Sequence, residues 1–196
     1  MLALSVTALA EEKEIVHSVR SPNGSLEAES GIRAYLDSTK GRVTVRHQGK
    51  EIFDRTYGPE RELRYLKLSW SPSSGALLIG DNYKYGMDLA VIRFSPREGR
   101  ATGATNFPLT DRMHRVIEVH TAWRDELKSH APVGRVVWDT VKWVSNTRST
   151  MTYIFHGLGR EAAADVTVDL SGAEPKLIIN NVRPRVPAGL FEVDRE

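Results

Sequence analysis

The chain has 196 residues, of which 40% are hydrophobic, which is enough for one folded domain and too many for a disordered chain. The 27 Lys and Arg residues nearly balance 25 Asp and Glu residues and form no basic cluster, so we expect no nucleic-acid partner. The chain contains no cysteine, which excludes disulfides, thiolate metal sites and a cysteine nucleophile.

The first ten residues are apolar and uncharged, and the charged run Glu11–Glu14 follows them abruptly. They end in Ala8-Leu9-Ala10, and small residues at these positions are what a signal peptidase accepts. We interpret residues 1–10 as a signal-peptide remnant and residues 11–196 as a single β-rich domain that is periplasmic or secreted. No stretch reaches the roughly 20 apolar residues of a transmembrane segment.

Short strands joined by tight turns are predicted for the beginning of the domain. Ile15 to Arg20 is the first candidate strand, and Asn23-Gly24 after it is a strong hairpin signal. Leu26 and Ala28 alternate with glutamates, and the segment around Val43 to His47 alternates in the same way. This period of two is typical of strands with one buried face.

A second block begins near Leu63. A strand from Leu66 to Trp70 and a Ser-Pro turn precede the continuous apolar run Ala76–Ile79, which predicts a strand buried on both faces. We expect a polar loop from Gly80 to Met87, a strand from Leu89 to Phe94, and a linker over residues 95–109 that is rich in Gly, Pro and Thr.

Between residues 111 and 130 the apolar spacing changes to that of an amphipathic helix. Thr110 is the predicted N-cap, and Ala131-Pro132 ends the helix. We expect the helix to dock on the β core through Met113, Val116, Ile117, His120 and Leu127.

A third block of strands follows the helix. Val137, Val141 and Trp143 share one face, and candidate strands cover Met151–Phe155, Val166–Leu170 and Leu177–Val182. The predicted fold class is therefore mainly β, with antiparallel blade-like sheets in a partial propeller or a β-sandwich, and one inserted amphipathic helix near 111–130.

The segment Leu68-Ser69-Trp70-Ser71-Pro72, followed by Gly75 and an apolar strand, resembles the β-propeller repeat of WD40-like, TolB-type periplasmic proteins. Ser21-Pro22 repeats the turn about 50 residues earlier, and a block around Trp143 has similar order without Pro or Gly. The resemblance implies blade-like sheets, a binding role, and equivalent buried places for Trp70 and Trp143. The alternative is that Trp-Ser-Pro marks only a strand end and a tight turn.

Three groups of polar residues are candidates for chemical sites. His114 and Glu118 lie at helical spacing, but a solvated helix face explains them. Asp81, Asn82 and Asp88 surround Tyr83 and Tyr85 and offer oxygen ligands for calcium, although a plain polar loop is favoured. Asp139 is predicted on the inward face of a strand, where a structural aspartate is favoured over a catalytic acid.

The sequence favours an exported, non-catalytic binding domain that contacts another protein, as an inhibitor or immunity protein does. We expect no cofactor, no metal and no catalytic residue, and we choose Tyr83, Tyr85 and Arg93 as binding residues because such side chains dominate protein contacts. One alternative is an envelope hydrolase or carbohydrate-acting enzyme that uses Asp139, His114 or His156. Another is a structural module of an envelope assembly. The oligomeric state stays open.

Overall fold

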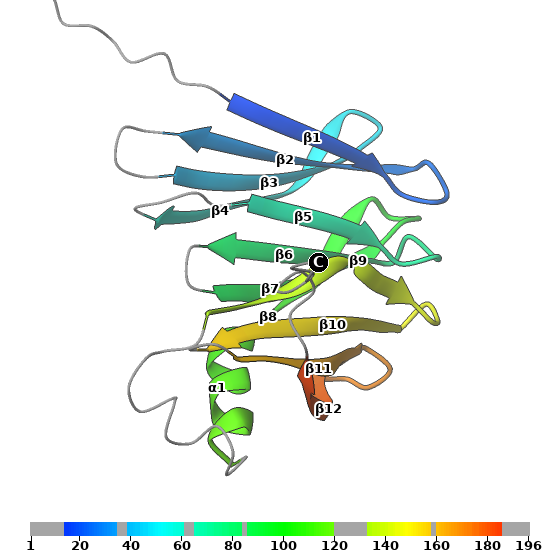
Figure 1. Ribbon diagram of the computed structural model, residues 1–196. Coiled ribbons are helices and arrows are strands. Elements are labelled where there is room, and N and C mark those ends of the chain that lie inside the picture. Colours follow the sequence, from blue (N-terminus) through cyan, green and yellow to red (C-terminus); the bar gives the residue numbers. More distant parts are fainter. Residues whose placement is uncertain are drawn as a thin grey trace, which may run out of the picture.

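The computed structural model describes residues 14–34, 39–60, 65–83, 86–119, 133–157 and 160–185, which form three four-stranded sheets and one helix (Figure 1). Sheet A contains β1 (Glu14–Arg20), β2 (Leu26–Ala34), β3 (Thr39–His47) and β4 (Lys50–Glu60). Sheet B contains β5 (Tyr65–Trp70), β6 (Ala76–Tyr83), β7 (Gly86–Ser95) and β8 (Arg100–Phe107). The helix α1 (Leu109–Val119) follows β8 in the chain, and sheet C contains β9 (Val133–Trp143), β10 (Arg148–Gly157), β11 (Arg160–Asp169) and β12 (Lys176–Arg185).

Each sheet is a meander in which strands consecutive in the chain pair antiparallel. The predicted class, mainly β with antiparallel sheets and one helix, is confirmed. The linker predicted over residues 95–109 is wrong, because most of it forms β8, which pairs with β7.

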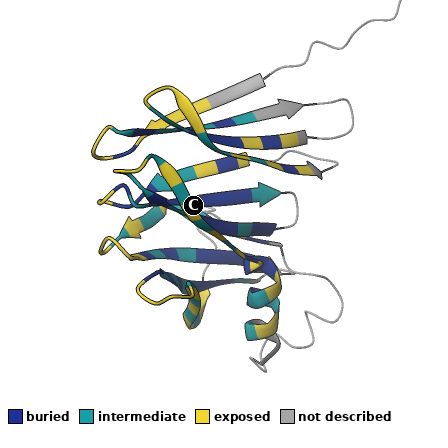
Figure 2. Cartoon of the chain, turned by 180° about the vertical axis from the view of Figure 1, so that it is seen from behind, coloured by how far each residue is buried: buried dark blue, intermediate teal, exposed yellow. Residues whose placement is uncertain are grey.

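Sheet B is the middle layer of the stack, with sheet A on one face and sheet C on the other (Figure 1). Side chains alternate along β6, so Leu77 and Ile79 enter the core shared with sheet A, whereas Ala76 and Leu78 enter the core shared with sheet C. Seen from behind, buried residues follow the central strands and exposed residues gather at the turns (Figure 2). The predicted two-sided burial of Ala76–Ile79 is confirmed.

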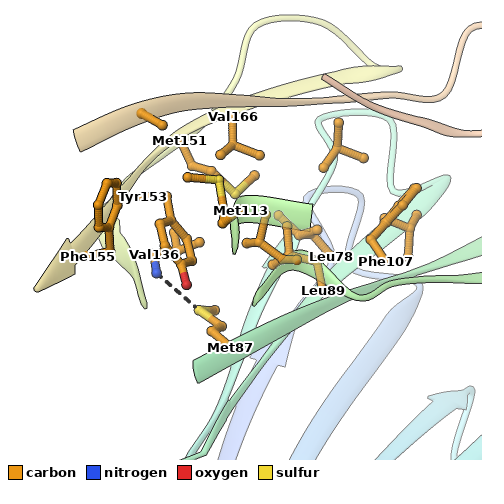
Figure 3. Close-up of a cluster of buried hydrophobic side chains, with 14 of the residues drawn as sticks. Leu78, Met87, Leu89, Phe107, Met113, Val136, Met151, Tyr153, Phe155 and Val166 are labelled. Carbon is orange, nitrogen blue, oxygen red and sulfur yellow. Dashed lines mark hydrogen bonds between the residues drawn. The ribbon is translucent and has the colours of Figure 1, made fainter. Parts of the chain in front are cut away.

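The larger core lies between sheets B and C and includes the start of α1 (Figure 3). Met87 contributes its sulfur as an acceptor for the backbone N–H of Val136, at 3.4 Å. The ring of Tyr153 occupies the space above Gly134, where a Cβ atom would lie 2.2 Å from the tyrosine hydroxyl. The Met87 contact therefore links sheet B to sheet C, and the Tyr153 contact packs β10 closely against β9 within sheet C.

The turns after β1 and β5 have the same hydrogen bonds. Ser21 N donates to Leu26 O at 2.9 Å, and Ser71 N donates to Ala76 O at 2.8 Å. In both turns the serine hydroxyl also accepts the backbone N–H five residues later, at 3.0 Å. The fourth residue has positive φ in each turn, Gly24 in the first and Ser74 in the second, so Gly75 is not the counterpart of Gly24.

Trp70 and Trp143 also make equivalent contacts, each to the sheet before its own. The indole N–H of Trp70 donates to Val19 O at 3.0 Å, and that of Trp143 donates to Ser69 Oγ at 3.1 Å. Val19 and Ser69 each lie two residues before the serine of their turn. Trp70 is buried as predicted, whereas Trp143 is half-buried.

The helix α1 starts at Leu109, so Thr110 lies inside it and the prediction that Thr110 is the N-cap is wrong. Met113 is fully buried against the core, as predicted, and Val116 is half-buried. The side chains of Ile117, His120 and Leu127 lie outside the described residues. Within the described ranges, no helix is long and apolar enough to cross a membrane.

Both outer faces of the stack carry ion pairs. On sheet A, Arg46 pairs with Glu29, and Arg42 lies 2.6 Å from Asp54. On sheet C, Arg148 lies 2.7 Å from Asp169, and Arg183 lies 2.9 Å from Asp165. Because these outer faces are polar, they can face water. No further sheet is needed to cover sheet A or sheet C. The stack has one layer more than a two-sheet β-sandwich.

Candidate functional site

The segment around Tyr83 is a tight hairpin, so the prediction of a polar loop from Gly80 to Met87 is wrong. The strand β6 continues through Tyr83, and β7 starts at Gly86. Asp81 pairs directly with Asp88 across this hairpin. Two acidic side chains therefore lie on one face of sheet B, facing sheet A beside the apolar core.

Asp88 has a structural task at the start of α1. Its carboxylate accepts the backbone N–H groups of Leu109 and Thr110, which have no partner inside the helix. An anion at a helix N-terminus is stabilised by the helix dipole. Burial and the nearby charge of Asp111 nevertheless raise the pKa of Asp88 above its ordinary value, with burial the larger cause.

Tyr83 is half-buried, and its hydroxyl donates to Asp88 at 3.5 Å. Burial, as the largest cause, raises the pKa of Tyr83. Its hydroxyl therefore faces Asp88, the same carboxylate that binds the start of α1. Tyr85, the second predicted binding tyrosine, lies outside the described residues.

A small pocket of about 190 Å³ lies between the edge strands β4 and β8. Arg55 crosses its mouth, since its Nη1 donates to Asn106 Oδ1 at 2.6 Å and its guanidinium lies 4.9 Å from the centre of the Tyr57 ring. The pocket is lined by Arg55, Tyr57, Asp81, Asp88, Leu89, Ala90, Asn106, Phe107 and Pro108. Because Arg55, Asn106 and Asp88 all bind other parts of the protein, we interpret the pocket as the packed junction of sheets A and B.

A second hollow, of about 320 Å³, lies on the outer face of sheet C. Its floor includes Ile154 and Ala163, which are buried. The hydroxyl of Thr140 donates to Val137 O at 2.6 Å and accepts the N–H of Thr152 at 2.8 Å, and Arg183 is paired with Asp165. Thr140 and Arg183 at this hollow are thus engaged within the protein.

Asp139 and His156, two of the residues considered for catalysis, lie far apart. Asp139 is exposed, so its predicted inward orientation is wrong; a break in the register of β9 and β10 next to it changes which side chains face the core. His156 is exposed and lies 2.8 Å from Glu161. It pairs with Val133, which places it roughly 20 Å along β9 from Asp139.

His114 is half-buried on α1, and neither it, Asp139 nor His156 lines either hollow. In the part of the chain that the structure describes, no three His, Asp or Glu side chains are arranged to hold a metal ion. Asp81 and Asn82 are consecutive residues of β6 and therefore point to opposite faces of sheet B, so they do not converge with Asp88 on one calcium ion.

Arg93 differs from the other predicted binding residues. It is half-buried in β7, and no described residue gives it a hydrogen bond or an ion pair. It pairs with Gly103 of β8, and a Cβ atom at Gly103 would lie 3.4 Å from one terminal nitrogen of Arg93 and 3.6 Å from its Nε. The guanidinium therefore lies across the outermost strand of sheet B.

Tyr83 and Arg93 do not form one site. Gly86, the partner of Tyr83, and Arg93 are seven residues apart along β7, a separation of about 23 Å. The sequence predicted Arg93 as a binding residue but did not predict the strand β8 beside it. The small residues of β8 show no alternation of apolar and polar side chains, and its threonines were the only strand signal.

Comparisons of the chain with models of protein families, with curated proteins and with solved structures gave no match.

Proposed function

We propose that the protein is an exported, non-catalytic binding domain that contacts another protein through the edge of sheet B that is formed by β8. Its three sheets are interpreted as blades of the WD40-like, TolB-type kind. The repeated serine turn and the two equivalent indole contacts support this interpretation. They recur at corresponding places in successive sheets, as expected of repeated units.

The observation that supports the binding function most strongly is that Arg93 is half-buried and has no partner among the described residues. A half-buried guanidinium has lost part of its hydration and gains most from a charge-assisted hydrogen bond. Arg93 makes no such bond within the described chain, whereas Arg55 at the first hollow and Arg183 at the second are both paired. Arginine is also among the residues that dominate protein interfaces. Arg93 is therefore available for an acidic group of a partner.

The test is affinity capture from envelope extract with the chain from Glu11 onward as bait. We expect the wild type to retain a discrete protein in stoichiometric amount and Arg93→Ala to lose most of it. Arg135→Ala is the matched control, because Arg135 is exposed and likewise has no partner among the described residues. Absence of any retained protein, or a measured turnover of an envelope substrate, would contradict the proposed function.

A further inference from the structure

We infer that β8 is a strand-addition site that takes an extended, acidic segment of a partner protein, with a carboxylate of that segment bound to Arg93. The inference rests on the proposed function and names the chemistry of its partner. Strand addition to an open edge is a recurring way for sheets to bind peptides, because the backbone supplies the hydrogen bonds.

The composition of β8 sets it apart from the other edge strands. Edge strands are normally protected by charged residues or proline against pairing with other chains. In β8 the only charged residue is Arg100 at its first position, and no proline occurs in it. Edge strands β1, β4, β5, β9 and β12 each carry a charged residue beyond their first position, and β4 and β12 also carry proline.

The open side of β8 is accessible. It is the last strand of its sheet, and no described strand pairs with its other side. Thr102, Ala104 and Asn106 are exposed, and Gly103 and Thr105 are half-buried. Arg55 of β4 contacts the side chain of Asn106, so the stretch from Thr102 to Thr105 is the accessible part. The register from Gly103 to Phe107 is regular, which offers a partner about 17 Å of straight strand.

Arg93 supplies the charge preference. The register shift of β7 and β8 falls immediately after it, and bulges of this kind redirect side chains near binding sites. Because Gly103 has no side chain, the guanidinium lies over β8 and is within reach of a strand added there. Antiparallel pairing of two β8 strands centred on Gly103 would bring two Arg93 side chains together, which disfavours a second copy in that register.

The probe is a displayed library of random twelve-residue peptides, selected against the wild-type chain. We expect the selected peptides to be rich in β-branched residues and to carry Asp or Glu. Binding should protect backbone amides of β8 from hydrogen exchange. The same selection against Arg93→Glu should favour Lys or Arg at the corresponding place.

A matched pair of variants at Gly103 tests the ion pair without removing Arg93. A Cβ atom fits there at ordinary contact distance. Gly103→Glu places a carboxylate of the chain itself beneath the guanidinium and should weaken the selected peptides at least tenfold, whereas Gly103→Gln should weaken them less than threefold. Unfolding curves of both variants establish that each is folded.

Equal loss of binding in both folded variants would overturn the inference, as would selected peptides that protect no β8 amide. A concentration-dependent dimer that protects β8, seen by analytical ultracentrifugation, would replace the partner segment with a second copy and also overturn it. If these results contradicted the inference while Arg93→Ala still captured a partner, the protein would bind that partner through another surface. The failure of the inference is therefore distinct from the failure of partner binding altogether.

Discussion

At the scale of single residues, the turn serines do more than the motif containing them suggested. Ser71 closes its turn through both its backbone and its hydroxyl, and Ser21 does the same one sheet earlier. Ser74 joins the two turns, because its hydroxyl accepts the backbone N–H of Asn23 at 3.1 Å. A residue other than glycine is kept at positive φ there, where its side chain links two sheets.

The first prediction concerns this turn. Ser71→Ala removes the acceptor for the buried N–H of Ala76, and we expect a loss of about 1–2 kcal/mol in the free energy of unfolding, measured with urea. Ser73→Ala is the control in the same turn. Ser73 is exposed, and its hydroxyl makes only long hydrogen bonds, to the N–H of Gly75 at 3.3 Å and to the Ser71 hydroxyl at 3.4 Å, so its loss should cost less than about 0.5 kcal/mol. An equal loss in both variants would show that the hydroxyl of Ser71 has no special role.

The second prediction concerns pH. Because the pKa of Asp88 is raised on folding, this residue stabilises the fold fully below its unfolded pKa of about 3.9, and that contribution is lost as the pH rises through the folded pKa. The free energy of unfolding of the wild type should therefore fall, relative to Asp88→Asn, as the pH rises from about 4 toward neutrality. The asparagine can still accept the amides of α1.

Asp165 provides the opposite control for this titration. The Asn181 amide and the Arg183 guanidinium lower the pKa of Asp165. Its contribution is present above the unfolded pKa and is lost as the pH falls through the folded pKa. Wild type and Asp165→Asn should therefore diverge with the reverse sign, at acidic pH. If the Asp88 pair showed this same sign, the buried-carboxylate interpretation would be wrong.

At the scale of elements, α1 is attached to β7 by a dense set of polar contacts. Thr110 accepts the N–H of Met87 at 2.9 Å and donates to the carbonyl of the same residue at 3.1 Å, while Asp88 binds the first amides of the helix. This approach requires glycine at position 86, where a Cβ atom would lie 2.3 Å from the hydroxyl of Thr110. The position of the helix thus depends on a residue without a side chain.

Gly86→Ala should accordingly destabilise the protein by about 1–3 kcal/mol, because the helix start must move away from β7. Gly172→Ala is the matched control, since a Cβ atom there meets only ordinary contacts, the nearest at 3.5 Å. Chemical denaturation of both variants measures the difference. A Gly86→Ala protein as stable as the control would mean that α1 is not fixed at this point.

The elements show what the sequence could and could not predict. The run Ala76–Ile79 and the alternation near Leu26 predicted strands correctly, because burial on one or two faces leaves a pattern in the residues. The strand β8 was missed, because its small residues carry no such pattern. Asp139 was placed on the wrong face, because a break in register cannot be derived from the spacing of residues within one strand.

At the scale of the whole molecule, the stack of three sheets explains why Arg93, and not the other candidate residues, is placed to bind a partner. Tyr83 donates a hydrogen bond to Asp88 beside the start of α1, and Asp81 and Asp88 lie at the junction of sheets A and B. Arg93 lies in the middle sheet but at its outer side, where the chemistry of the open strand β8 adds to its charge. The charge of Arg93 and the open edge of β8 come together only in the folded sheet, since Arg93 lies in β7.

Site-directed photo-crosslinking in cells that produce the protein tests this account most directly. A photoreactive amino acid replaces exposed Ala104 on β8, and the controls carry it at Glu51 on sheet A or Lys142 on sheet C, both also exposed. We predict a discrete crosslinked protein from position 104 that disappears when Gly103→Glu is added, and no such product from positions 51 and 142. Crosslinks that form from sheet A or sheet C, with none from β8, would contradict the account.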